Sequence, residues 1–479
     1  MEKLKKNFIY VPLILVELYL IITLLLYQFG PLNWHTENEV MFWVLIFAYH
    51  FVFIAGYLLA VKKFKLRIPN VEKLNNKRVL NIFLWVVVFI CAICFFIEYR
   101  NTTFSNSFSI TDFIENFIKG LENPALQYYG KSQAALTFVS NKLLTLVAAA
   151  FAFIYIGMVP LFIFLWNRLN YFHKFAFYII VFLRIAIYVS IGTNKGIFDM
   201  LFYIGSSLLI CFLLNFNKGS LLEFFKQKSL ILFCCFLLVF SFCYFTHNIS
   251  TRVGSVIDYT ENIVNKNEHN DNNDNSNHLD NDNNHNDESN SDQDDNTNSN
   301  IQDTENNDTS DQNTSFIKRM YYSVTNYVTQ GYYGMSLALD EEFTTTYGIG
   351  HSAFLRSNFK SIFGIDVDDR TYQHKITELW DEDGQWHSFY SYIANDVSFY
   401  GVIVVMFIIG LYYGALSKDA IYNDSIIAKI IITLLVIMFV YMPANNQLLT
   451  SMYTFCAFFE LTFIWLVSKL FGKKELIHE

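Results

Sequence analysis

Long apolar runs recur along the chain and limit what it can fold into. Ten runs of about 16 to 24 residues occur within its 479 residues, and 53% of all residues are hydrophobic. Each run is long enough to cross roughly 30 Å of hydrocarbon at about 1.5 Å per residue. Within lipid, only α-helices and closed β-barrels satisfy their own backbone polar groups, and these runs lack the alternation of barrel strands. We therefore predict an all-α integral membrane protein with about ten transmembrane helices. The runs are 8–29, 40–61, 79–97, 143–166, 172–191, 197–216, 230–245, 397–416, 426–441 and 448–467.

Basic residues predict the orientation of these spans. Lys and Arg cluster before the first run and after every second run, whereas the loops 30–39 and 442–447 contain none. Short cytoplasmic loops collect Lys and Arg. We therefore expect both termini in the cytoplasm and the segments 98–142, 192–196 and 246–396 outside.

The large external loop between spans 7 and 8 has two parts of different composition. From about 261 to 315 it consists almost wholly of Asn, Asp, Ser, Glu, His and Thr, which is too little apolar surface to offset the entropy of ordering. We expect a disordered, dispensable insertion there. From 316 onward apolar residues return at helical spacing up to 339, which predicts a helix that lies in the headgroup layer or packs on its neighbours.

Four segments are thus expected. They are the membrane region with spans 1 to 7 (1–247), the disordered Asn/Asp-rich external insertion (248–315), an ordered external loop (316–396), and spans 8 to 10 with the cytoplasmic tail (397–479).

The sequence favours neither a metal site nor a disulfide framework. All seven cysteines fall inside apolar runs, where small buried side chains are the ordinary interpretation. The stretch DVDD at 366–369 is similar to the metal-binding DxD of nucleotide-sugar transferases, but no nucleotide-binding pattern accompanies it. A basic stripe with interleaved aromatic residues is also missing from the sequence, so we expect no metal, no cofactor and no nucleic-acid partner.

Arg184 is the strongest single signal, because it lies inside the fifth run. A guanidinium in that position is costly and normally faces a polar cavity or a partner. Lys195 follows eleven residues later and shares the same helix face if the helix continues. Two such cations near the outer surface suit a diphosphate group. The alternative is a structural ion pair of Arg184 with Asp199 or Glu17.

Short Tyr- and Gly-rich motifs flank the last three runs. They are YxxQGYYG from Tyr327, TYGIGHS from Thr346 and DxxFYG from Asp396, and the sequence GTNKG at 192–196 ends the fifth run. With ten or more spans and a large external loop late in the chain, this pattern resembles the bacterial oligosaccharide repeat-unit polymerases, the O-antigen polymerase (Wzy-like) family. GTNKG is similar to the Gly-Ser-Arg-Gly turn of such proteins, with Lys195 in the Arg position.

The resemblance implies a membrane glycosyltransferase that needs no metal and inverts the configuration at the transferred sugar. A growing glycan on undecaprenyl diphosphate is moved onto a newly flipped lipid-linked repeat unit, which makes capsular or other surface polysaccharide on the outer face of the bacterial cytoplasmic membrane. The implied partners are the lipid-linked oligosaccharide, membrane lipids, and flippase and chain-length regulator proteins.

A transfer of this kind needs cations for the departing diphosphate and a base for the acceptor hydroxyl. Arg184, Lys195 and residues of the external loop supply the candidates. For the diphosphate these are Lys195, Arg252, Arg319 and Arg356, and for the base His351, His387 and Asp396.

Two other functions fit much of the same pattern. An O-antigen-ligase-like glycan transferase has a similar architecture and a different acceptor. A flippase or transporter of the lipid-linked oligosaccharide is less favoured, because such proteins tend to show internal repeats that this sequence lacks.

Overall fold

The computed structural model describes residues 8–64, 76–105, 108–137, 141–217, 227–270 and 308–471. Within these ranges it leaves out the side chains of 132–133, 135–137, 217, 252–270, 308–317 and 319. The described part is helical and contains no β-strand, which confirms the prediction of an all-α, multi-pass membrane protein.

Helices coincide with all ten predicted runs. In the described part of the chain nine spans are long and apolar enough to cross a membrane, and the shorter α17 matches the remaining run. In chain order the ten are α2 (Val11–Phe29), α3 (Glu39–Lys63), α4 (Lys77–Thr103), α7 with α8 (Lys142–Ala150 and Ala152–Phe164), α9 (Tyr171–Ser190), α10 (Lys195–Asn217), α12 (Lys228–Asn270), α16 (Phe389–Tyr422), α17 (Ile426–Tyr441) and α19 (Met452–Leu470).

Further helices fill the connections, and all but α13 are short. They are α5 (Ile110–Glu122), α6 (Pro124–Thr137), α13 (Asp308–Ala338), α14 (Ala353–Phe363), α15 (Tyr372–Lys375), α18 (Gln447–Thr450) and the 3₁₀ helices η2 (Trp166–Arg168) and η3 (Asp368–Arg370). The helix predicted over 316–339 is confirmed as part of α13. Its last turns are packed on neighbours, since Tyr332 and Met335 are fully buried and the Tyr332 hydroxyl lies 3.1 Å from that of Thr23 in α2.

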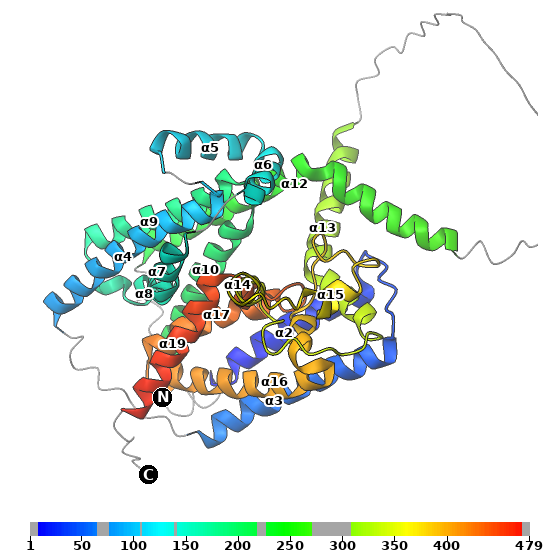
Figure 1. Ribbon diagram of the computed structural model, residues 1–479. Helices are drawn as coiled ribbons and strands as arrows, with labels where there is room; N and C mark the ends of the chain where they lie inside the picture. Colours follow the sequence, from blue (N-terminus) through cyan, green and yellow to red (C-terminus); the bar gives the residue numbers. More distant parts are fainter. Residues whose placement is uncertain are drawn as a thin grey trace, which may run out of the picture.

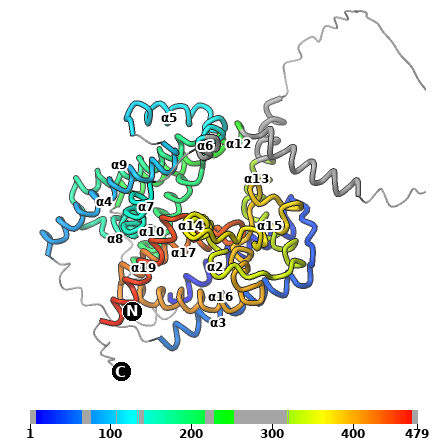
Figure 2. Tube along the Cα trace, in the orientation of Figure 1, coloured from blue at the N-terminus to red at the C-terminus, as the bar shows by residue number. Residues whose placement is uncertain are grey.

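The helices form two groups on either side of α17 (Figures 1 and 2). One group contains α4 to α9 and α12, and the other contains α2, α3, α13, α15 and α16. Helix α17 contacts members of both groups, and every residue from Ala428 to Phe439 is buried except Val436. It is therefore the central helix of the membrane region.

Glycines allow α3 and α16 to approach closely along their length. A Cβ atom added to Gly56 of α3 would lie 2.4 Å from the Phe407 carbonyl oxygen, and one added to Gly410 of α16 would lie 2.2 Å from that of Phe53. Small residues at such contacts are the usual means by which transmembrane helices pack. This contact makes α3 and α16 a tightly packed pair.

The start of the first span and the end of the last lie at the same end of the molecule. There the Tyr57 hydroxyl donates to the Ile9 carbonyl at 2.6 Å, and Lys418 of α16 donates to the Val61 carbonyl at 2.8 Å. Lys469 of α19 pairs with the neighbouring Asp419 at 2.5 Å. An even number of spans produces this arrangement, and the cytoplasmic location of this end stays a prediction.

Several element boundaries differ from the expected ones. Helix α16 begins at Phe389 instead of 397, because Ser388 caps it by accepting a hydrogen bond from the Ser391 N–H at 3.2 Å. Glu98, expected at the start of an external segment, lies inside α4. Of the segment 248–315, the backbone is helical at 248–270 and 308–315, and 271–307 lies outside the described residues.

The helix of Arg184 does not continue to Lys195, so the condition under which the two cations would share a helix face is not met. Helix α9 ends at Ser190, Gly192 adopts a φ of +66°, and α10 begins at Lys195. A Cβ atom at Gly192 would lie 1.9 Å from the Pro124 carbonyl oxygen of α6, so both the turn and the close approach require glycine.

Candidate functional site

Arg184 lies in a buried polar group formed by α4, α8 and α9. Its Nε is 3.8 Å from Glu98 Oε2, and its guanidinium lies over the Tyr155 ring at 4.4 Å from the ring centre. Both Tyr155 and Tyr188 donate their hydroxyl hydrogens to Glu98, the latter at 3.1 Å. The ion-pair partner is therefore Glu98 and not Asp199 or Glu17, because α4 packs along α9 and brings the carboxylate to this level.

Several polar atoms around Arg184 have no hydrogen-bond partner among the described residues. They are Arg184 Nε and Nη1, Asp199 Oδ1 and the hydroxyls of Tyr203 and Tyr453, and all are buried. Tyr203 and Tyr453 both lie within electrostatic reach of the guanidinium. Buried polar atoms without partners are costly, so this group has free capacity to bind a polar ligand.

Lys195 reaches the same group from the next helix. Its Nζ lies 2.8 Å from Asp199 Oδ2 and 5.7 Å from the centre of the Tyr188 ring. Tyr188 also donates to Glu98, the partner of Arg184. The turn at Gly192 thus brings the two predicted cations to the same tyrosine, although they do not share one helix.

His351 and Asp396 form a pair near the opposite group of helices. His351 Nδ1 lies 2.7 Å from Asp396 Oδ2, and the backbone N–H groups of His351 and Gly350 donate to the same carboxylate at 3.1 and 2.9 Å. The Thr346 hydroxyl donates to it as well. A carboxylate on Nδ1 holds the imidazole in one orientation and leaves Nε2 as the basic nitrogen. The side chain of His351 is 18% exposed, which is sufficient for access to a substrate.

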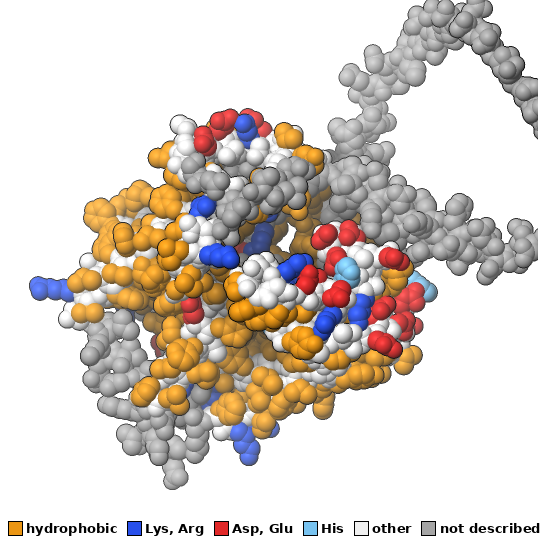
Figure 3. Space-filling model, viewed as in Figure 1, with side chains coloured by type: hydrophobic (Ala, Val, Ile, Leu, Met, Phe, Trp, Pro, Cys, Tyr) orange, Lys and Arg blue, Asp and Glu red, His pale blue; other side chains and the backbone are white. Residues whose placement is uncertain are grey.

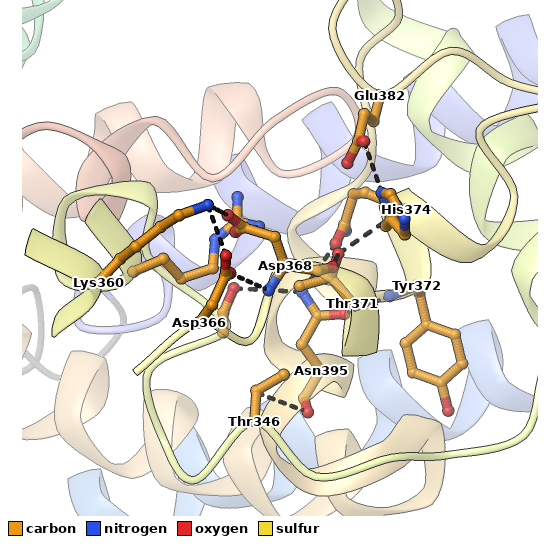
Figure 4. A network of polar contacts seen from close by, with 12 residues as sticks. Thr346, Lys360, Asp366, Asp368, Thr371, Tyr372, His374, Glu382 and Asn395 are labelled. Atoms are coloured by element: carbon orange, nitrogen blue, oxygen red, sulfur yellow. Dashed lines mark hydrogen bonds and ion pairs between the residues drawn. The ribbon is translucent and has the colours of Figure 1, made fainter. Parts of the chain in front are cut away.

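Asn395 holds this pair in position. Its side chain is fully buried, and its Nδ2 donates to Gln373 Oε1 at 2.8 Å and to the Gly350 carbonyl at 3.2 Å. Its Oδ1 accepts from the Tyr372 N–H at 2.9 Å, which ties α15 to α16 (Figure 4). Asn395 is not among the residues predicted from the sequence, and its position next to Asp396 was the available signal.

Two further cations of the external loop, Arg356 and Lys360, are engaged in ion pairs. Arg356 Nη1 lies 2.8 Å from Asp368 Oδ1. Lys360 Nζ lies 2.5 Å from Asp366 Oδ2 (Figure 4). The Lys360 ammonium holds the pKa of Asp366 below its ordinary value. The carboxylates of the DVDD stretch thus neutralise neighbouring cations. The side chains of Arg252 and Arg319 lie outside the described residues.

His387 does not join His351 and Asp396. It is fully buried, neither ring nitrogen has a hydrogen-bond partner among the described residues, and burial lowers its pKa to about 3. His374, in contrast, is exposed and pairs with Glu382 at 2.8 Å. Of the three predicted bases, the structure brings together His351 and Asp396 and leaves His387 apart.

The first turn of α19 connects the two polar groups. The Tyr453 ring lies 5.5 Å from that of Tyr155 beneath Arg184, and the Phe455 ring lies 6.4 Å from that of His351 at an angle of 25°. The helix start is not capped by the Ser451 side chain. In the face of the molecule drawn in Figure 3, Lys and Arg side chains surround a central hollow, which lies between α6 and α14. Backbone N–H groups at a helix start favour anions, so the start of α19, which lies between the two groups, is suited to one.

The fold and this site define an all-α, multi-pass membrane protein with a buried cationic group and a His–Asp pair on either side of the start of α19. No protein-family model matches the chain, and neither does a curated protein or a solved structure.

Proposed function

We propose that the protein is a membrane glycosyltransferase that polymerises undecaprenyl-diphosphate-linked oligosaccharide repeat units into capsular or other surface polysaccharide. The observations that carry this proposal are the pairing of His351 with Asp396 and the buried Arg184 group, which lie on either side of the start of α19. A base held by a carboxylate and a cation with unpartnered nitrogens are the two components that such a transfer needs.

The residues divide the reaction between them. The hydroxyl oxygen of the acceptor sugar attacks the anomeric carbon of the growing glycan, while the bond from that carbon to the diphosphate oxygen breaks. His351 Nε2 takes the proton of the hydroxyl, and Asp396 stabilises the imidazolium that forms. Arg184 and Lys195 stabilise the charge on the departing undecaprenyl diphosphate. The donor's diphosphate linkage supplies the driving force, so the transfer consumes no nucleotide.

The outer face of the bacterial cytoplasmic membrane is the proposed location of this reaction. The His351 pair lies at the end of the molecule opposite the Lys-rich helix ends, and short basic loops favour the cytoplasm. A surface polysaccharide is assembled on the side where its repeat units arrive after flipping.

The test is the length distribution of lipid-linked and surface glycans in a strain that lacks the protein, resolved on a gel beside the parent strain. We expect single repeat units on the outer face and no long ladder. The native gene and a His374→Ala variant, which alters an exposed His–Glu pair in the same loop, restore the ladder. A His351→Ala variant, at equal protein level, lowers polymer formation by roughly 10²- to 10⁴-fold.

Two outcomes of this experiment would overturn the proposal. Full-length polymer stranded on its lipid carrier would identify a ligase. Repeat units trapped inside the cell would identify a flippase or transporter.

A further inference from the structure

Six aromatic side chains form a closed circuit of ring contacts between the two groups of helices. Going around it, the distances between ring centres are 6.4, 5.9, 6.1, 4.6, 6.4 and 5.5 Å. The rings come from α10, α12, α13, α17 and the loop before α16, and we refer to them as the aromatic collar. Its members, in the order of contact, are Phe198, Phe202, Tyr441, Trp386, Tyr327 and Phe245.

An apolar groove of about 290 Å³ begins at the collar and extends toward the basic end of the bundle. It is lined by α2, α10, α16 and α17, and Phe202 belongs to both the collar and the groove. The polar residues Tyr19 and Ser206 turn their hydroxyls to the backbone carbonyls of Val440 and Phe202. The groove therefore offers an apolar surface within the membrane.

The buried Arg184 group lies at the collar end of this groove. Tyr203, which follows Phe202 of the collar, interacts electrostatically with Arg184 and with Asp199. Asp199 in turn pairs with Lys195 at 2.8 Å. Asp199 lies one helical turn before the groove residue Phe202. Along α10, a cationic polar group is thus followed directly by aromatic rings and then by an apolar channel.

We propose that the groove holds the polyprenyl chain of the lipid-linked substrate, with the collar around the isoprene units nearest the diphosphate. This inference rests on the proposed function and identifies where the carrier lipid binds. A polyprenyl diphosphate has one apolar chain attached directly to two phosphates, which matches one groove below one cationic group. A phospholipid carries two chains on a glycerol and fits this arrangement less well. Aromatic rings in such mainly edge-to-face contact suit an unsaturated, branched chain that has to be held beside a charged headgroup.

Gly205 provides a means of closing the groove without disturbing the packing. It lines the groove, and a Cβ atom added there meets no other atom within 4 Å. A Gly205→Trp substitution therefore projects into the groove. Val436, the one residue between Ala428 and Phe439 of α17 that is not buried, also lines the groove and allows a second variant, Val436→Trp. Leu238→Trp is the matched control, because Leu238 is 58% exposed on α12 and does not line the groove.

The experiment uses the full-length protein in nanodiscs and undecaprenyl diphosphate with a photoreactive group on an isoprene unit. We expect labelling of the groove helices in the native protein and in Leu238→Trp, and about tenfold less labelling in Gly205→Trp and Val436→Trp. Unlabelled undecaprenyl diphosphate in excess should compete, whereas phosphatidylglycerol should not. Melting temperatures of the four proteins show that each remains folded.

Equal labelling of all four proteins, or equal competition by phosphatidylglycerol, would overturn the inference and identify the groove as a site for bulk lipid. The readout is independent of polymer formation. Specific labelling in a protein whose absence leaves the glycan ladder intact would uphold the groove and reject the polymerase function. Non-specific labelling in a protein whose absence removes the ladder would reject the groove as the polyprenyl site and uphold the polymerase function.

Discussion

The charge of a side chain inside a transmembrane helix has to be compensated by neighbouring groups. For Arg184 the neighbours compensate the charge but not all of the hydrogen-bond donors. Glu98 offsets its charge, and Tyr155 provides a ring face for the guanidinium. The Nε to Oε2 distance of 3.8 Å is nevertheless longer than a hydrogen bond, and two guanidinium nitrogens have no hydrogen-bond partner among the described residues. The ion pair thus keeps Arg184 charged and oriented while leaving donors for an anionic substrate.

The lowered pKa of His387 predicts that the stability of the protein depends on pH. Its pKa is about 3 in the folded protein, whereas an exposed histidine has a pKa of roughly 6.5. Below pH 6.5 the unfolded chain binds a proton that the folded protein does not, so stability decreases as the pH falls. The loss is about 1.4 kcal/mol per pH unit between these two values, or roughly 2 kcal/mol at pH 5.

Thermal unfolding of the purified protein between pH 7.5 and pH 5 checks this expectation. Replacement of His387 by Asn, which does not titrate, should reduce the loss of stability in that range. His374→Asn serves as the control, because His374 is exposed. Identical pH profiles for the native protein and His387→Asn would contradict the prediction.

At the scale of elements, α16 combines a membrane span with the part of the site that holds Asp396. Ser398 interrupts this helix with φ 62° and ψ 165°, a conformation that is essentially limited to glycine and costs about 1 to 3 kcal/mol. The Tyr49 hydroxyl of α3 stabilises the break by donating to the Phe399 carbonyl at 2.7 Å. The break separates the turns that carry Asn395 and Asp396 from the span below, so these residues keep the orientation that the His351 loop requires.

The contact between α3 and α16 gives a prediction at the same scale. In Gly410→Leu, the new Cβ atom would lie only 2.2 Å from the Phe53 carbonyl oxygen of α3. The two helices therefore have to separate. We expect a loss of stability of at least about 1 to 3 kcal/mol and a lower melting temperature in detergent. Gly130→Leu is the control, because a Cβ atom at Gly130 meets no atom within 4 Å. Equal melting temperatures for the two variants would mean that the helices are not packed as described.

At the scale of the whole molecule, the two groups of helices meet through a few elements in the described part of the chain, with α17 at the centre (Figure 1). The Arg184 group belongs to one side, and the His351 pair belongs to the other. The start of α19 and the aromatic collar both lie where the two sides meet. A substrate that binds between them would contact both sets of polar residues at once.

The topology leads to a prediction on this scale. A reporter enzyme fused after Ser315 should be active only outside the cytoplasm, and one fused after Lys474 only inside, because Lys and Arg are concentrated at the ends that carry the termini. A fusion after Arg168, in the basic connection between α8 and α9, should also report the inside. The opposite pattern at all three positions would reverse the orientation and place His351 and Asp396 in the cytoplasm.

The sequence by itself determined the helices and several of the candidate residues. A run of apolar residues long enough to cross a bilayer has to be helical, because its backbone polar groups have no other partners in lipid. For this reason all ten runs coincide with helices, and Arg184 was recognisable as an unusual charge. The same reasoning placed the start of α16 too late, since the segment 389–396, which mixes aromatic and polar residues, forms a helix once it is capped and packed.

Only the tertiary structure decided which residues meet. Glu98 and Arg184, like His351 and Asp396, are far apart in the sequence, and their pairing depends on which faces of α4, α9 and α16 pack together. The tertiary structure also separates His351 from His387 and forms the collar and the groove from elements that are distant in the sequence. Helix length and hydropathy are local properties that a single run encodes. The choice of packing partners is a property of all the helices together, because each contact depends on the shape of several others.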